Sequence, residues 1–167
     1  VDAWHGVNQA GIDGGVRVTG CRRDGTIMAG KSVQLYVQAA VKAALTSQVT
    51  SGGATVPVVD NPYDGQTAPY IVCNNIVETW DDDFNTPQRW LTVTVDVYTT
   101  DYKTAGTVTN KDIRRQIINT LAGGSLTITG CTFRGCLLID NGVEFIELDG
   151  ETVHGQCRFR IHVDTLT

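Results

Sequence analysis

Basic residues are scarce in this sequence. Lysine and arginine number 13 against 18 aspartates and glutamates, which gives a formal net charge of −5 at pH 7. A surface that grips nucleic-acid phosphates needs clustered lysine and arginine side chains. The charge balance therefore argues against tight nucleic-acid binding.

Long apolar runs are also absent. No stretch reaches the roughly 18 consecutive apolar residues that a membrane-spanning helix needs. The first thirty residues contain no apolar core of the kind found in signal peptides. We therefore expect a soluble protein that is neither exported nor bound to a membrane.

The sequence has few cysteines. There are five, an odd number, at positions 21, 73, 131, 136 and 157. The chain does not look like a small disulfide scaffold, so we expect reduced thiols. Cys131, Cys136, His154 and Cys157 form a conceivable zinc set. On strands, however, His154 and Cys157 would point to opposite faces, and so would Cys131 and Cys136 unless Gly135 forms a bulge. The spacing favours buried thiols that behave as small apolar side chains, and we predict no metal site.

Apolar residues, in contrast, are plentiful. They make up 41% of the 167 residues, against 19% charged. This length suits one domain with a real core and is short for two. We expect residues 31–167 to form that domain and the glycine-rich residues 1–30 to form an N-terminal arm or extension.

The clearest strand covers residues 89–100. Its apolar side chains fall on one side of an extended chain, and its polar and aromatic ones fall on the other, a period of two that only a strand produces. The residues predicted to face the core are Leu91, Val93, Val95 and Val97. We predict that this strand is the centre of the sheet.

The other expected elements are arranged around it. Apolar residues at three- and four-residue steps predict helices, whereas alternation predicts strands. The second helix should bury Ile113 and Ile117 and expose Lys111, Arg114 and Arg115. The order predicts an α+β fold, with a single mostly antiparallel sheet of about four or five strands and two helices packed on one face. The expected helices span 32–48 and 104–121 or 110–121, and the further strands span 70–80, 126–139 and 152–163.

Residues 25–32, Gly-Thr-Ile-Met-Ala-Gly-Lys-Ser, match the pattern GxxxxGK[ST] of a phosphate-binding loop. In such a loop Lys31 would reach the outer phosphates and Ser32 would hold magnesium. The motif also needs a buried apolar strand just before it in a parallel sheet, which residues 18–24 do not resemble. A glycine-containing turn ahead of a helix is the favoured interpretation, and nucleotide binding is the alternative.

Three adjacent aspartates lie at the tip of a hairpin predicted between the strand at 70–80 and the central strand. Consecutive carboxylates at a strand end diverge, and no histidine, lysine or nucleophile adjoins them in sequence. An aromatic residue among charges suits protein contact. We predict a protein interface formed by Trp80, Asp81, Asp82, Asp83 and Phe84, with Trp4 of the N-terminal arm.

The last predicted strand presents a polar row on one face, formed by His154, Gln156, Arg158, Arg160 and His162. Such a row could bind an anion or act in catalysis, but it is also the ordinary composition of the open face of a sheet. No Gly-x-Ser-x-Gly elbow, HExxH or paired-cysteine motif is present. We predict no catalytic residue, no cofactor and no enzyme activity.

The order of these elements resembles the tail-terminator proteins of long-tailed bacteriophages, also called tail-completion or head–tail joining proteins. The resemblance runs from Lys31 to the end of the chain. It rests on the order of elements together with Pro69-Tyr70-Ile71-Val72 at the start of a strand, the strand from Trp90 to Tyr98, Leu121-Ala122-Gly123 after the second helix, and His154-Gly155-Gln156-Cys157-Arg158-Phe159-Arg160 in the last strand.

The resemblance implies an α+β subunit without catalytic residues that forms a ring, usually six-fold, at the head-proximal end of the tail. The implied partners are copies of the chain, the tail tube protein and the head-side connector or stopper protein. The implied location is the tail or neck of a virion assembled in the host cytoplasm. Six copies would carry six times the charge of −5, so we expect DNA to pass through the lumen without specific binding.

Overall fold

The computed structural model of the chain describes residues 32–62, 66–83 and 86–165, with the backbone alone for residues 80–83, 86, 87 and 165. Trp4, Phe84 and the phosphate-loop match up to Lys31 therefore lie outside the described residues. Among the described helices, none is long and apolar enough to cross a membrane.

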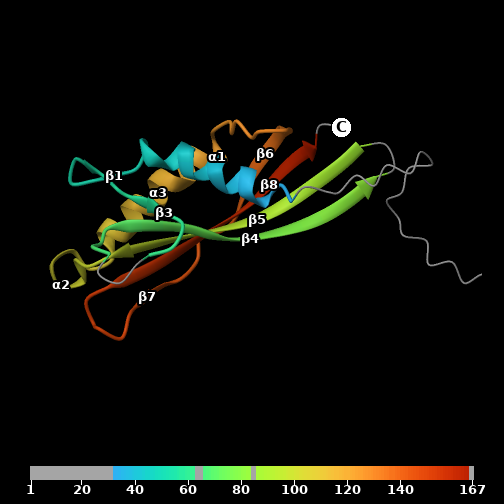
Figure 1. Cartoon of the computed structure of the whole chain (residues 1–167). Coiled ribbons are helices and arrows are strands. Elements are labelled where there is room, and N and C mark those ends of the chain that lie inside the picture. Colours follow the sequence, from blue (N-terminus) through green and yellow to red (C-terminus); the bar gives the residue numbers. More distant parts are fainter. Residues whose placement is uncertain (1–31, 63–65, 84–85, 166–167) are drawn as a thin grey trace, which may run out of the picture. The chain divides into compact units, whose positions relative to one another are not determined.

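One main sheet organises these residues (Figure 1). The strands in spatial order are β3 (Val58–Val59), β4 (Tyr70–Asp83), β5 (Thr86–Thr99), β8 (Val153–Thr165) and β6 (Cys131–Asp140), with β7 (Glu144–Ile146) paired to β8 as well. All of these pairs are antiparallel except β3 with β4. A separate small hairpin joins β1 (Thr50–Ser51) to β2 (Ala54–Thr55).

The predicted central strand is confirmed. β5 lies between β4 and β8, and Leu91, Val93, Val95 and Val97 are fully buried. Their neighbours on β8, including Phe159 and Ile161, are fully buried as well. The alternation in the sequence therefore places one face of the sheet on the core.

Two helices cover that face. α1 (Gln34–Thr46) packs over β3 and β4, while α3 (Val108–Ala122) packs over β5, β8 and β6; α2 (Tyr102–Ala105) is a single turn. Figure 1 shows α1 and α3 on the same side of the sheet. Val37, Val41, Ile113 and Ile117 complete the core from the helical side. The predicted α+β class is confirmed, and the main sheet has six strands because the short β3 and β7 join the four long ones.

The main differences from the expected elements lie at strand ends. β6 begins at Cys131 rather than at residue 126, because the chain turns at Gly130, whose φ is +73°. Leu126 and Ile128 still reach the core from the preceding loop. β4 continues through Asp83, where Asp83 pairs with Thr86, so the aspartates predicted at a hairpin tip are part of the ladder.

Candidate protein-interaction site

The predicted interface residues are only partly described. Trp80, Asp81, Asp82 and Asp83 continue β4, and Trp80 pairs with Arg89 across the hairpin. Their side chains, and all of Trp4 and Phe84, lie outside the described part of the chain. The role of these six residues in an interface therefore stays a prediction.

The predicted phosphate loop is described only at Ser32, whose hydroxyl lies 3.4 Å from Glu78 Oε2 of β4. Among the described strands the only parallel pair is β3 with β4, so the sheet lacks the repeated parallel crossovers that such a loop accompanies. Nucleotide binding gains no support from this arrangement. Loss of Mg-ATP binding in Lys31→Ala would be the observation in its favour.

The polar row of β8 lies on the face of the sheet opposite the helices, where aromatic rings stack across the strands. Tyr70 stacks on Tyr98 with ring centroids 4.9 Å apart, and Tyr98 stacks on His154 at 4.3 Å. Phe145 of β7 meets the edge of the same imidazole at 4.4 Å. Burial, with the nearby carboxylate of Asp96, raises the pKa of Tyr98 to about 12.

The histidines of this row have partners. His154 Nε2 lies 2.9 Å from Asp96 Oδ1, and His162 stacks on Trp90 with centroids 4.1 Å apart. The guanidinium of Arg160 lies over the same indole, 4.9 Å from its centroid. Most of the predicted row is therefore engaged in contacts within the sheet, while Arg158 and Arg160 are its exposed members.

The predicted alternative of a zinc site is not assembled. Cys157 is buried on the core side, whereas His154 lies on the open face. A bulge between Phe133 and Gly135 lets Cys131 and Cys136 both pack toward the core, as the conditional prediction required. In the ranges that the structure covers, no group of three or more histidine, cysteine, aspartate or glutamate side chains is arranged to hold a metal ion.

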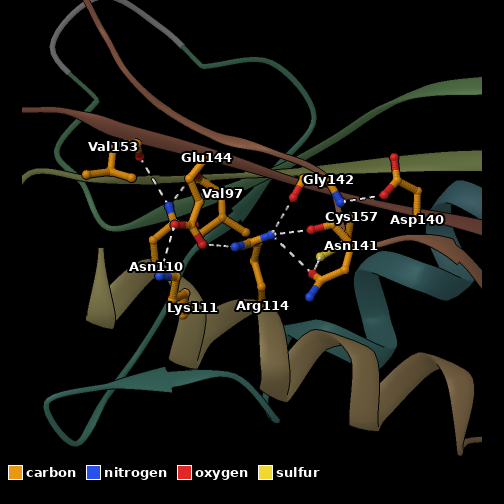
Figure 2. A network of polar contacts seen from close by, with 10 residues as sticks. All are labelled: Val97, Asn110, Lys111, Arg114, Asp140, Asn141, Gly142, Glu144, Val153 and Cys157. Carbon is orange, nitrogen blue, oxygen red and sulfur yellow. Dashed lines mark hydrogen bonds and ion pairs between the residues drawn. The ribbon is translucent and has the colours of Figure 1, made fainter. Parts of the chain in front are cut away.

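Arg114 corrects one sequence prediction. It was expected on the wet face of the second helix, but it is only 4% exposed and points from α3 toward the sheet (Figure 2). Its guanidinium pairs with Glu144 of β7, and Nη1 donates to Asn141 O at 2.6 Å and to Asn141 Oδ1 at 3.1 Å. These partners offset the cost of burying the charge.

A second buried polar residue lies one turn earlier on α3. Asn110 is fully buried, and Nδ2 donates to Val97 O at 3.0 Å and to Val153 O at 3.2 Å (Figure 2). Gly155 of β8 leaves the space for this contact, since a Cβ there would lie 2.1 Å from Asn110 Oδ1. Together Asn110 and Arg114 fasten α3 to β5, β8 and the link between β6 and β7.

The sequence contains a signal for this network that its residue types obscure. Asn110, Arg114, Ile117 and Leu121 follow steps of four, three and four, so all four share one helix face. An isolated glycine in a regular strand, here Gly155, commonly marks a close approach of another chain segment. The sequence prediction gave more weight to the charge of Arg114 than to its place on the buried face of the helix, and it therefore placed the side chain in water.

One edge of the sheet carries a concentration of exposed apolar side chains that the sequence reasoning missed. Seven large apolar residues between positions 137 and 148 are at least one-third exposed: Leu137, Leu138, Ile139, Val143, Phe145, Ile146 and Leu148. They belong to the end of β6, to β7 and to the loops around β7. We refer to residues 137–148 as the apolar edge. Exposed apolar side chains gathered in one part of a surface are typical of a protein contact.

Comparison with known proteins decides the family. The family model of tail completion protein gp17 matches residues 33–164 of the chain. The chain belongs to this family. The match runs from the start of α1 nearly to the end of β8, so the resemblance predicted from the sequence is confirmed.

A solved structure has the same fold. A chain in the virion of a native gene transfer agent (GTA) particle aligns with a TM-score of 0.67 and 17% sequence identity, over 80% of this chain and 98% of that chain. No curated protein matches the chain. As a member of the tail completion family, the protein is a structural component of a phage or phage-like virion and associates with other virion components.

Proposed function

We propose that the protein assembles into a ring, of six copies, at the head-proximal end of the tail. There the ring ends the polymerisation of the tail tube and joins the tail to the head-side connector or stopper protein. One ring face matches the end of the tube, and the opposite face docks the connector. The lumen lets DNA pass without specific binding.

The observation that carries this proposal is the family match over residues 33–164. A structural role also agrees with the surface of the described domain. The polar side chains of its open sheet face are largely engaged with one another, and seven of its exposed large apolar side chains gather at the apolar edge. A subunit that works by assembly needs contact surfaces rather than an enclosed site.

The charge of the chain supports the passage of DNA. The formal net charge is −5 per copy, so a ring of six repels a polyanion overall. The argument depends on which side chains line the lumen. An electrostatic map of the assembled ring tests it, because a basic lumen would contradict free passage.

Polymerisation of the tail tube protein in the presence of this protein tests the function. We expect substoichiometric amounts to shorten the tubes and to appear at one end only in electron micrographs. Heat-unfolded protein is the matched control. Binding along the tube wall, or tubes of unchanged length at saturating protein, would contradict a terminator.

A further inference from the structure

The apolar edge has none of the lysine, arginine or proline side chains that protect many natural edge strands. Residues 136–148, Cys-Leu-Leu-Ile-Asp-Asn-Gly-Val-Glu-Phe-Ile-Glu-Leu, contain no lysine, arginine or proline. β6 and β7 pair with β8 on one side, and no other described strand pairs with them on the other. An edge strand without a described partner, with Leu137 and Ile139 exposed on it, is a template for another strand. In the working state we expect it to be covered.

The opposite edge of the same sheet is only partly paired by the described strands. β3 pairs with β4 only at Ile71 and Val72. Beyond residue 73, β4 continues to Asp83 with no further described strand on that side. Val77 in this part of β4 is 56% exposed. Among the described strands, the sheet therefore has an edge without a partner strand at each side.

The strand directions make these two edges complementary. β4, β5, β8 and β6 alternate in direction, because each pair of neighbours is antiparallel. β6 therefore runs opposite to β4. A second copy in the same orientation would present its β4 antiparallel to β6 of the first, and such a head-to-tail contact repeats until a ring closes.

We infer that the apolar edge of one copy pairs with the free part of β4 in the next copy, so that the main sheet continues from subunit to subunit. This contact rests on the proposed ring function and specifies how the copies meet. It gives each of the two edges the partner strand that the described part of the chain does not supply, and it covers the large apolar side chains that gather at β6 and β7. The buried network supports it, because Arg114 holds Asn141 in the link between these two strands.

The proposal brings a defined pair of side chains together. Leu137 lies opposite Arg160 in the ladder, and Val77 lies opposite Thr92. Arg160 and Thr92 are themselves cross-strand partners, so all four side chains lie on the open face of the sheet. Leu137 of one copy and Val77 of the next are therefore candidates for a cross-strand pair. The two strands could also align a few residues away from this register.

Disulfide cross-linking of full-length protein tests this pairing. The background is Cys21→Ser with Cys131→Ser, which leaves three buried cysteines. A mixture of the single variants Leu137→Cys and Val77→Cys should yield a cross-linked dimer on mild oxidation, whereas either variant alone should not. The double variant should give a ladder of covalent oligomers that ends at the ring size. Cysteines at the neighbouring positions 139 and 75 test other registers of the same two strands.

Three outcomes would overturn the inference. Dimers from Leu137→Cys alone would indicate a symmetric contact of two apolar edges. In the second outcome, the thiol of Leu137→Cys resists alkylation in a monomeric protein and becomes reactive when residues 1–31 are deleted. That result would show that the N-terminal segment covers the edge. Rings observed by native mass spectrometry that show no cross-link in any register would leave the ring function standing and refute this contact.

A substitution pair gives an independent test. Leu137→Arg places a charge on the apolar edge, and Val108→Arg places one on α3. The two positions are similarly exposed, at 63% and 68%. We expect Leu137→Arg to weaken ring assembly by at least about tenfold and Val108→Arg to leave it unchanged. Both variants should keep the wild-type melting temperature of the subunit, which excludes misfolding as the cause. Equal assembly of the two variants would refute the inference.

Discussion

Replacing Arg114 with methionine is the substitution that most sharply tests the structural account. Methionine keeps much of the aliphatic stem but removes the charge. In the wild-type protein the side chains of Arg114 and Glu144 are 5% and 12% exposed. The substitution leaves the Glu144 carboxylate nearly buried, and the nearest cation is then Nζ of the exposed Lys111, at 3.5 Å.

The magnitude follows from the contacts that are lost. Breaking a buried ion pair by removing one partner costs about 3–5 kcal/mol, because an uncompensated charge stays behind. Asn141 O and Oδ1 also lose a charged donor at 2.6 and 3.1 Å, which is included in that range because such terms do not add. We expect Arg114→Met to lower the free energy of unfolding by about 3–5 kcal/mol, a large part of the roughly 5–15 kcal/mol typical of a domain.

Urea unfolding followed by tryptophan fluorescence measures this loss. Arg115→Met is the matched control, since the neighbouring arginine is 72% exposed and pairs with Asp112 at the surface. A surface pair of this kind contributes about 0–1 kcal/mol. The double variant Arg114→Met/Glu144→Gln removes the stranded charge and should recover at least about 1 kcal/mol relative to Arg114→Met. A loss in Arg114→Met no larger than that in Arg115→Met would refute the reasoning.

Three further results are expected. Asn110→Ala should lower the unfolding free energy by about 1–3 kcal/mol, because the buried carbonyls of Val97 and Val153 lose their donor, and urea titration measures it. Gly155→Ala should destabilise strongly, because its Cβ would lie 2.1 Å from Asn110 Oδ1, whereas Gly135→Ala, with no atom within 4 Å of its Cβ, should melt like wild type. Stability should fall between pH 9 and 11, because burial raises the pKa of the Cys136 and Cys157 thiols to about 11 and that of Cys73 to about 12. The thiols of the unfolded chain ionise first, near pH 9, so rising pH favours unfolding. Urea midpoints that do not fall over this range would contradict the prediction.

Much of the fold could be predicted because its main signals are local. The strict alternation around Leu91 and Val95 fixes the central strand, and the apolar spacing from Ile113 to Leu121 fixes α3. The position of β5 in the middle of the sheet follows from having strong strands before and after it in the chain. These features depend on a few neighbouring residues, which the sequence displays directly.

The rest could not be predicted because it depends on contacts between distant segments. Whether Arg114 is wet or buried depends on Glu144, thirty residues later, and on the space above Gly155. The residues Leu137 and Ile139 look like those of a core strand, and only the position of β6 at the sheet edge makes them exposed. The confirmed family resemblance came from the order of elements together with a few short sequence motifs, and neither reveals which surfaces meet in the assembly.

The native mass of the purified full-length protein tests the central claim, assembly through copies of the chain, most directly. Sedimentation equilibrium over a wide concentration range, with and without tail tubes, gives that mass. We predict a closed species of six times the 18.0 kDa of one chain, either free or on the tube end. A chain that remains at 18.0 kDa at every concentration, and binds tubes as a monomer, would contradict the account.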